Sequence, residues 1–214
     1  MIFLSLQSQG KAYTFFMKNI NIQLPDWRRI NWKSPINTIS ALSLVWALLY
    51  IFYPDIIFHG GIRNHHASIF RFIEEMILYS FLHAGVLHVF SNIVFFFFIG
   101  RIIEQTHGQK WTWYLWVWTT VFVGIFLAIF SESRTIGWSG FAMSLLAVYA
   151  YDLRKQQRWS DYKWALLLIV INLIIGGSAS VSFLGHFAGL IAGLVYSWFR
   201  HKLPHFSHIF SRKN

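Results

Sequence analysis

The chain of 214 residues is 56% hydrophobic and 12% charged, about half the charged fraction of soluble domains, which argues against a soluble protein. Its net charge of +10 lies in clusters between apolar runs, which fits membrane topology rather than a nucleic-acid groove, so we expect no nucleic-acid partner. The lack of cysteine excludes disulfides and thiolate metal sites. Because the long apolar runs are typical of bilayer-spanning helices, the sequence predicts an all-α membrane protein.

Six apolar segments predict six transmembrane helices in one domain, residues 34–200. In chain order they are about Ile36–Tyr53, Val86–Arg101, Trp111–Phe130, Gly137–Tyr151, Tyr162–Ile175 and Leu184–Phe199. Several are shorter than a bilayer requires, so we expect short helices whose ends are shielded from lipid. The segment between the first two spans, residues 54–81, is too polar to cross, and we expect a structured outer-face loop with a short interfacial helix.

The basic residues predict the orientation of these spans. With a cytoplasmic N-terminus, 15 of the 18 Lys and Arg residues lie in cytoplasmic segments, and only Arg63, Arg71 and Arg134 lie outside. This bias follows the positive-inside rule, so we expect both termini in the cytoplasm. Residues 1–33 form an expected cytoplasmic leader without a signal-peptide layout, with Met17 as an alternative start, and residues 201–214 form a basic tail.

Polar residues inside membrane spans are costly, so each is a candidate functional residue. The first candidate is Ser139 in the motif Gly137-Trp138-Ser139-Gly140, which begins the fourth span. A serine at a helix N-terminus lies beside unpaired backbone N–H groups, and these donors can hold an oxyanion. Taken alone, the motif is better explained by an N-capping serine with glycine for close helix packing.

A second candidate is His186 in the sixth span, in the motif His186-x-x-Gly189-x-x-x-Gly193. At about 100° per residue these three positions lie on one helical stripe. The two glycines predict close approach of another helix, and His186 then points into the same contact. Taken alone, His186 also fits a packed, hydrogen-bonding role.

The third candidate group is His83-x-x-x-x-His88-x-x-x-Asn92, which enters the second span. His88 and Asn92 are one helical turn apart, so their imidazole and amide donors share a face. Structural hydrogen bonding and a zinc site are the alternatives, and zinc requires a third ligand. The outer loop offers candidate ligands at His59, His65 and His66.

No Asp or Glu lies within the fourth or sixth span, so a Ser-His-Asp triad has no evident third member. A dyad remains chemically coherent, because His186 can accept the Ser139 proton while the alkoxide attacks a carbonyl carbon. Glu104, with Arg101, lies at the cytoplasmic end of the second span and fits a structural tether.

Taken in order from about Phe81 to Phe199, these motifs resemble the rhomboid family. The resemblance implies a six-helix bundle with a water-filled cavity open to the outer face. It implies an intramembrane serine endopeptidase that cleaves membrane-spanning proteins in or near the membrane, without metal or cofactor. Ser139 would be the nucleophile and His186 the general base. The implied oxyanion donors are His88, Asn92 and the Ser139 backbone, with His83, Gly137 and Gly140 in support.

The sequence also departs from the family pattern. Glu74 and Glu75 stand where the family often has a Trp-Arg pair, and Met143 stands where an aromatic often packs on the catalytic histidine. A catalytically silent rhomboid-like protein that binds membrane helices is the main alternative function. A transporter or channel is a second, although paired ionisable residues at the midplane and broken repeats are lacking. The compact six spans without a transit peptide favour a bacterial inner membrane, and substrate and oligomeric state stay open.

Overall fold

The computed structural model describes residues 31–53, 55, 60–64, 68–83, 85–176 and 182–202. The chain divides into two units, residues 1–31 and 32–214, and every helix given below belongs to the second. Residues 1–30 of the expected leader, with Met17, and residues 203–214 of the expected tail lie outside the described residues.

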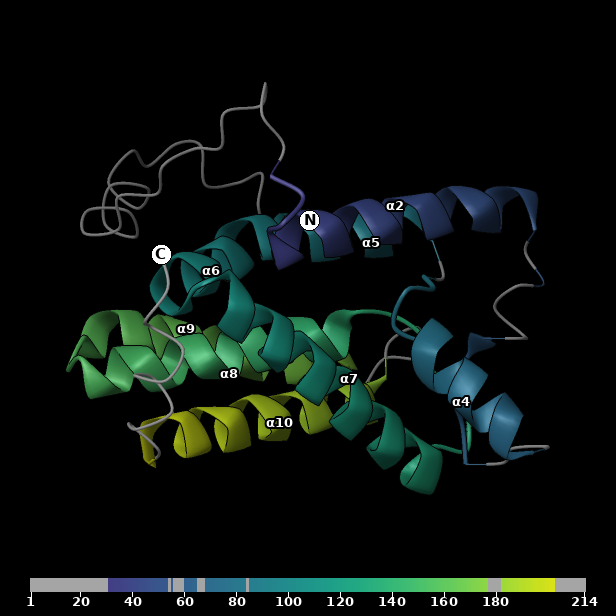
Figure 1. The fold of residues 1–214 in the computed structure, drawn as a ribbon. Coiled ribbons are helices and arrows are strands. Elements are labelled where there is room, and N and C mark those ends of the chain that lie inside the picture. Colours follow the sequence, from purple (N-terminus) through teal and green to yellow (C-terminus); the bar gives the residue numbers. More distant parts are fainter. Residues whose placement is uncertain are drawn as a thin grey trace. The chain divides into compact units, whose positions relative to one another are not determined.

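Helices occupy all six predicted segments (Figure 1). They are α2 (Pro35–Phe52), a continuous run of α5 (Val86–Phe95), η2 (Phe96–Gly100) and α6 (Arg101–His107), then α7 (Gln109–Phe130), α8 (Ser139–Lys155), α9 (Trp159–Gly176) and α10 (Phe183–Lys202). Three of these stretches, Val86–His107, Gln109–Phe130 and Trp159–Gly176, are long and apolar enough to cross a membrane, and α2 is a shorter apolar helix. The predicted all-α membrane fold is confirmed, whereas six crossings stay a prediction.

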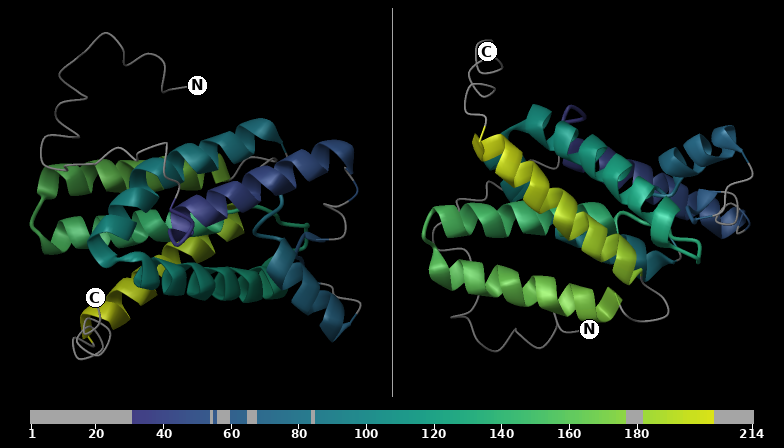
Figure 2. Two further views of the ribbon diagram at one scale, coloured as in Figure 1. Left: turned by 45° about the horizontal axis from the view of Figure 1, so that its top comes forward. Right: turned by 90° about the horizontal axis from the view of Figure 1, so that it is seen from below.

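The helix α8 is the buried centre of the second unit. Twelve of its 17 residues are buried, among them every position from Gly140 to Ala150. Helix α10 packs more extensively on α8 than on any other helix and also contacts α7 and α9 (Figure 2). By contrast, α9 leaves large apolar side chains exposed, including Leu167, Val170 and Ile174, as expected of a helix that faces lipid. A helix surrounded by protein needs little lipid-facing surface, which explains why α8 is only moderately apolar.

Glycines bring α10 and α8 into backbone contact. A Cβ atom at Gly189 would lie 2.9 Å from the Cα of Gly140, and one at Gly193 would lie 2.9 Å from the Cα of Ser144. Real Cβ atoms do not approach backbone so closely, so both positions require glycine. The two glycines singled out in the sequence therefore lie at the crossing of these helices.

A polar network ties the start of α2 to α6. The Ser34 hydroxyl donates to Glu104 Oε2 at 2.7 Å, and Arg101 donates to both Glu104, at 3.2 Å, and Asn37 Oδ1, at 2.6 Å. Glu104 is buried, so these donors compensate the removal of its carboxylate from water. Glu104 thus serves as a tether between two helices.

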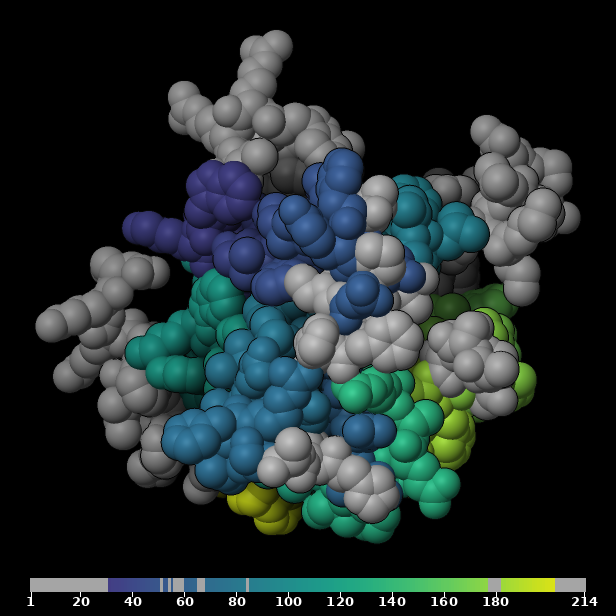
Figure 3. Space-filling model, turned by 90° about the vertical axis from the view of Figure 1, so that its right-hand side faces the viewer, coloured from purple at the N-terminus to yellow at the C-terminus, as the bar shows by residue number. Residues whose placement is uncertain are grey.

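The loop before the second span contains the expected short helix, α4 (Ile69–Leu78). One face of α4 is exposed and apolar, with Phe70 81% accessible, and Figure 3 shows this helix on the surface. On its other side, Glu75 is buried and pairs with Arg71 at 3.3 Å, while Glu74 pairs with the same arginine at 2.6 Å. The two glutamates that depart from the family pattern therefore form ion pairs within α4, and its interfacial location stays a prediction.

Candidate active site

Ser139 is the first residue of α8 and is partly exposed. The first α-helical bond of this turn runs from Ala142 N to Trp138 O, so the N–H groups of residues 139–141 precede the helical ladder. Gly137 has a φ of +112°, a conformation that favours glycine, and its N–H donates to Tyr79 O at 2.7 Å. The chain can therefore turn sharply and present Ser139 at the tip of the buried helix.

His186 lies in the first turn of α10 and is buried, with 4% of its surface exposed. Its Nδ1 lies 2.9 Å from the backbone carbonyl oxygen of Asn172 in α9. A carbonyl only accepts, so Nδ1 carries the proton and Nε2 keeps a free lone pair. Nε2 is buried and has no hydrogen-bond partner within the described part of the chain. The imidazole is therefore held in the tautomer that a general base requires.

The helix starts that carry Ser139 and His186 meet where Gly140 of α8 lies against Gly185 and Gly189 of α10, a contact called the seam below. Gly140, directly after Ser139, lies against Gly189, one turn beyond His186. On the same seam, a Cβ at Gly140 would lie 3.2 Å from the carbonyl oxygen of Gly185, directly before His186. The neighbours of both polar residues are thus in backbone contact.

His83 and Asn92 form a hydrogen-bonded pair beside this seam. Asn92 Nδ2 donates to His83 Nε2 at 3.1 Å, and His83 Nδ1 donates to the carbonyl oxygen of Phe81 at 3.1 Å. Burial, and secondly the neighbouring His88, lowers the pKa of His83 to about 3, so the ring is neutral near pH 7. The neutral ring fixes the Asn92 amide, whose second N–H is left to bind another group.

His88 connects this pair to the seam. Its ring lies 5.0 Å from that of His83, centroid to centroid, in an edge-to-face arrangement. On the other side, a Cβ at Gly137 would lie only 3.0 Å from His88 Cε1, so this glycine also makes room for the imidazole. Gly140, three residues beyond Gly137, lies against Gly185 and Gly189, which flank His186. The three candidate groups recognised in the sequence therefore gather in one region.

The zinc alternative finds no support among the residues that the structure describes. No three His, Asp or Glu side chains in the described ranges form a group that could hold a metal ion. Both ring nitrogens of His83 are hydrogen-bonded to Phe81 and Asn92. The other candidate ligands, His59, His65 and His66, lie outside the described residues.

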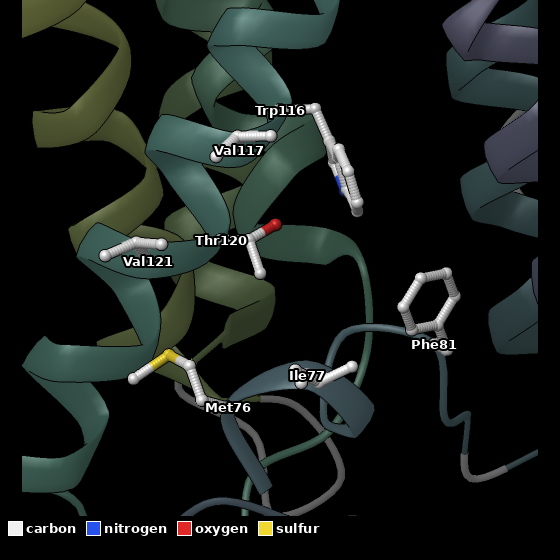
Figure 4. Close-up of a pocket in the computed structure, with 7 residues that line it drawn as sticks. All are labelled: Met76, Ile77, Phe81, Trp116, Val117, Thr120 and Val121. Atoms are coloured by element: carbon white, nitrogen blue, oxygen red, sulfur yellow. The ribbon is translucent and has the colours of Figure 1, made fainter. Parts of the chain in front are cut away.

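An apolar cavity of about 140 Å³ lies between α4 and α7, beside this region (Figure 4). Its lining residues are Met76, Ile77, Phe81, Trp116, Val117, Thr120 and Val121. Phe81 and Trp116 also pack on the buried ring of Trp138, at centroid distances of 4.9 and 5.9 Å. The aromatic wall of the cavity is thus continuous with the residue that precedes Ser139.

Sequence reasoning missed the backbone carbonyl of Asn172 as the group that orients His186. A carbonyl belongs to every residue and leaves no mark in the sequence, and residues 177–181, which lie outside the described residues, separate α9 from α10 along the chain. The side chain of Asn172 gives no hint either, because its Nδ2 donates to Leu168 O within α9 at 2.8 Å.

The chain is similar to several known proteins. A family model described as the Rhomboid domain matches residues 69–203, more than half of the chain. The chain is 25% identical over 204 residues to Rhomboid-type serine protease 2 of Saccharomyces cerevisiae, and the aligned region covers 82% of this chain and 77% of that protein. It is 24% identical over 208 residues to the rhomboid protease GlpG of Yersinia pestis, and here the aligned region covers 90% of this chain and 74% of that protein. Putative rhomboid protein L523 of Acanthamoeba polyphaga mimivirus is 25% identical over 129 residues, or 58% of this chain and 73% of that protein.

Proposed function

Because the chain belongs to the rhomboid family, we propose that it is an intramembrane serine endopeptidase that uses Ser139 and His186 as a catalytic dyad. The observation that carries this proposal is the state of His186. Its Nδ1 donates to the Asn172 carbonyl, and its buried Nε2 is without a partner in the described part of the chain. This lone pair allows His186 to act as a base, and Ser139 lies next to the same contact between α8 and α10, although no hydrogen bond joins Ser139 to Nε2 in the described part of the chain.

The reaction follows from these two groups. His186 Nε2 accepts the proton of Ser139 Oγ as the oxygen attacks the carbonyl carbon of the scissile peptide bond. The imidazolium then donates this proton to the leaving amine nitrogen, and the C–N bond breaks to leave an acyl ester on Ser139. Water, deprotonated by the same imidazole, hydrolyses the ester and restores both residues.

The oxyanion of the tetrahedral intermediate requires hydrogen-bond donors. We assign this role to the Ser139 backbone N–H, to His88 and to the second N–H of Asn92. His83 supports the site by holding the Asn92 amide, because His83 Nε2 accepts a hydrogen bond from one of the two amide N–H groups. Gly137 and Gly140 support it by their conformation and close packing. No step in this scheme requires a metal ion or a cofactor.

The substrates and the location follow from the same proposal. The protein is an integral membrane protein, and its substrates would be single-pass or polytopic membrane proteins cleaved in or near a transmembrane segment. The distribution of basic residues supports cytoplasmic termini. The compact domain of residues 34–200 suits a bacterial inner membrane.

Cleavage of a model membrane substrate in proteoliposomes tests the proposal. Ser139→Ala and His186→Ala should each abolish cleavage while the purified proteins remain folded, and the double variant should be no worse than either single one. Cleavage by Ser139→Ala at the rate of the wild type would exclude the dyad. A wild type that binds the substrate helix without cleaving it would instead favour a catalytically silent rhomboid-like protein.

A further inference from the structure

Two hydroxyl side chains connect the start of α10 to the segment that precedes α8. The Thr135 hydroxyl donates to Ser182 Oγ, with the oxygens 3.4 Å apart. Thr135 lies four residues before Ser139, and Ser182 lies four residues before His186. The contact therefore links the two chain segments that deliver the proposed nucleophile and base.

Ser182 holds the first turn of α10 in two ways. Its Oγ accepts from the N–H of Gly185 at 3.1 Å, which is the bond of an N-capping serine. Its carbonyl oxygen accepts from the N–H of His186 at 3.1 Å. The backbone position of His186 thus depends directly on where Ser182 lies.

On the other side of the contact, backbone hydrogen bonds hold Thr135 in place. Its N–H donates to Ile62 O at 2.8 Å, and its carbonyl oxygen accepts from Ile62 N at 3.0 Å, so the two residues form an antiparallel bridge. Ile62 is fully buried and Thr135 is 7% exposed. The Thr135 hydroxyl also lies 3.3 Å from Ser131 Oγ, so its single proton is shared between Ser131 and Ser182.

The contact lies beside Gly185, the residue directly before His186. A Cβ atom at Gly185 would lie 3.4 Å from Ser182 Oγ and 3.7 Å from the methyl group of Thr135. Gly185 in turn lies against Gly140, next to Ser139. The hydroxyl pair therefore lies on the same seam as the two glycines that bring α8 and α10 together.

We propose that Ser182 and Thr135 are a positioning pair that sets the placement of His186 relative to Ser139. The proposal rests on the catalytic role of these two residues. A capped helix would form without Thr135, but the side-chain link between Thr135 and Ser182 adds to the backbone contact of Gly185 with Gly140 in relating the start of α10 to the segment that carries the nucleophile. Proton transfer requires this relation, because a misplacement of about 1 Å can cost about 100-fold in rate.

Four variants in the full-length protein test the pair. Thr135→Val keeps the shape of the side chain and removes the hydroxyl, whereas Thr135→Ser keeps the hydroxyl and removes a methyl group. Ser182→Ala removes the cap and the link together, whereas Ser182→Thr can restore both. Two controls remove hydroxyls elsewhere: Thr106→Val, whose hydroxyl donates to Ile102 O at 2.8 Å, and Ser197→Ala, a buried serine of α10 without a partner among the described residues.

The readouts are kcat and KM for a model substrate in proteoliposomes, the rate at which a phosphonate labels Ser139, and the melting temperature. We expect Thr135→Val and Ser182→Ala to lower kcat and the labelling rate by about 10- to 100-fold, with KM within about twofold of the wild type. Thr135→Ser and Ser182→Thr should recover most of this loss, and both controls should match the wild type.

Thr135→Val decides the test if Ser182→Ala fails to fold, because it leaves the cap of α10 intact. Wild-type kcat and labelling in a folded Thr135→Val protein would overturn the positioning role while leaving the dyad in place. A lower melting temperature with unchanged kcat would also overturn it, since that result describes a structural contact alone. If Ser139→Ala cleaved like the wild type, the proposed function itself would fall, and the positioning role with it.

Discussion

The imidazole of His186 in α10 donates its Nδ1 proton to the backbone carbonyl of Asn172 in α9, at 2.9 Å. In serine proteases with a catalytic triad a carboxylate orients the histidine, and the buried apolar interior of a membrane domain makes a second ionised group costly. A main-chain carbonyl supplies the orientation without a charge. The base of the proposed dyad is therefore oriented by a neighbouring helix rather than by a third side chain.

This arrangement predicts that the side chain of Asn172 is dispensable although its carbonyl is not. Asn172→Ala removes only the amide, which donates to Leu168 O, and leaves the bond to His186 in place. We expect kcat within about threefold of the wild type, below the loss of about 100-fold or more that removal of a catalytic group causes. A loss as large as that of His186→Ala would identify the amide itself as a third catalytic group.

Large side chains in place of the α10 glycines that contact α8 should separate the two helices. Gly189→Leu and Gly193→Leu insert side chains where a single Cβ atom already meets backbone of Gly140 and Ser144. Overpacking of this kind costs about 1–3 kcal/mol or more, so thermal stability and cleavage should fall together. Leu194→Phe adds bulk to the exposed side of the same helix and serves as the control. Wild-type melting temperatures for both leucine variants would refute the close approach.

The oxyanion assignment predicts a defect in rate rather than in binding. Asn92→Ala and His88→Ala should each lower kcat more than they raise KM, because the negative charge develops only in the transition state. A single donor is worth roughly 3–4 kcal/mol in a rigid, dry site, and less where water replaces it, so we expect partial losses. Chelator separates this role from the zinc alternative. Inactivation of the wild type by chelator, with release of an ion in His88→Ala, would show that a metal is required.

The neutral state of His83 predicts a dependence of stability on pH. The pKa of His83 is lowered to about 3, against about 6.5 in an unfolded chain. Between these values the unfolded state binds a proton that the folded state does not, so the free energy of unfolding decreases as the pH falls below 6.5. The slope approaches about 1.4 kcal/mol per pH unit.

His83→Gln removes this titrating group, and thermal unfolding in detergent at about pH 7 and about pH 5 measures the effect. The melting temperature of the wild type should fall more between the two pH values than that of the variant. Equal changes in the two proteins would mean that His83 is not buried in its neutral form.

Much of the fold was predictable because it depends on local pattern. Apolar runs located the helical stretches, and the spacing of Gly189 and Gly193 predicted the close approach of another helix, which the structure identifies as α8. The π-helical turn of Phe96–Gly100 was not predictable, since no residue type specifies it and it is decided by packing, with Gly100 so close to α2 that a Cβ would lie 2.7 Å from Ile36 Cδ1.

Some groups of the candidate site were predictable from the sequence and others were not. Side chains with unusual chemistry for a membrane span, such as His186 and Asn92, are visible in a sequence because lipid disfavours them. The Asn172 carbonyl and the Thr135–Ser182 contact are not visible in the sequence. Backbone carbonyls and hydroxyl side chains are common everywhere, and these contacts form only when distant segments come together in the fold. The bond from Asn92 to His83 likewise depends on the turn between α4 and α5.

Covalent labelling by a serine-directed phosphonate tests the central claim most directly. The reagent reacts with a serine only where a neighbouring base activates its hydroxyl, and mass spectrometry identifies the modified residue. We predict that the wild type in lipid vesicles is labelled at Ser139, that His186→Ala slows labelling by at least about 100-fold, and that Ser139→Ala abolishes it. Labelling of Ser139 at the same rate in the wild type and in His186→Ala would contradict the dyad.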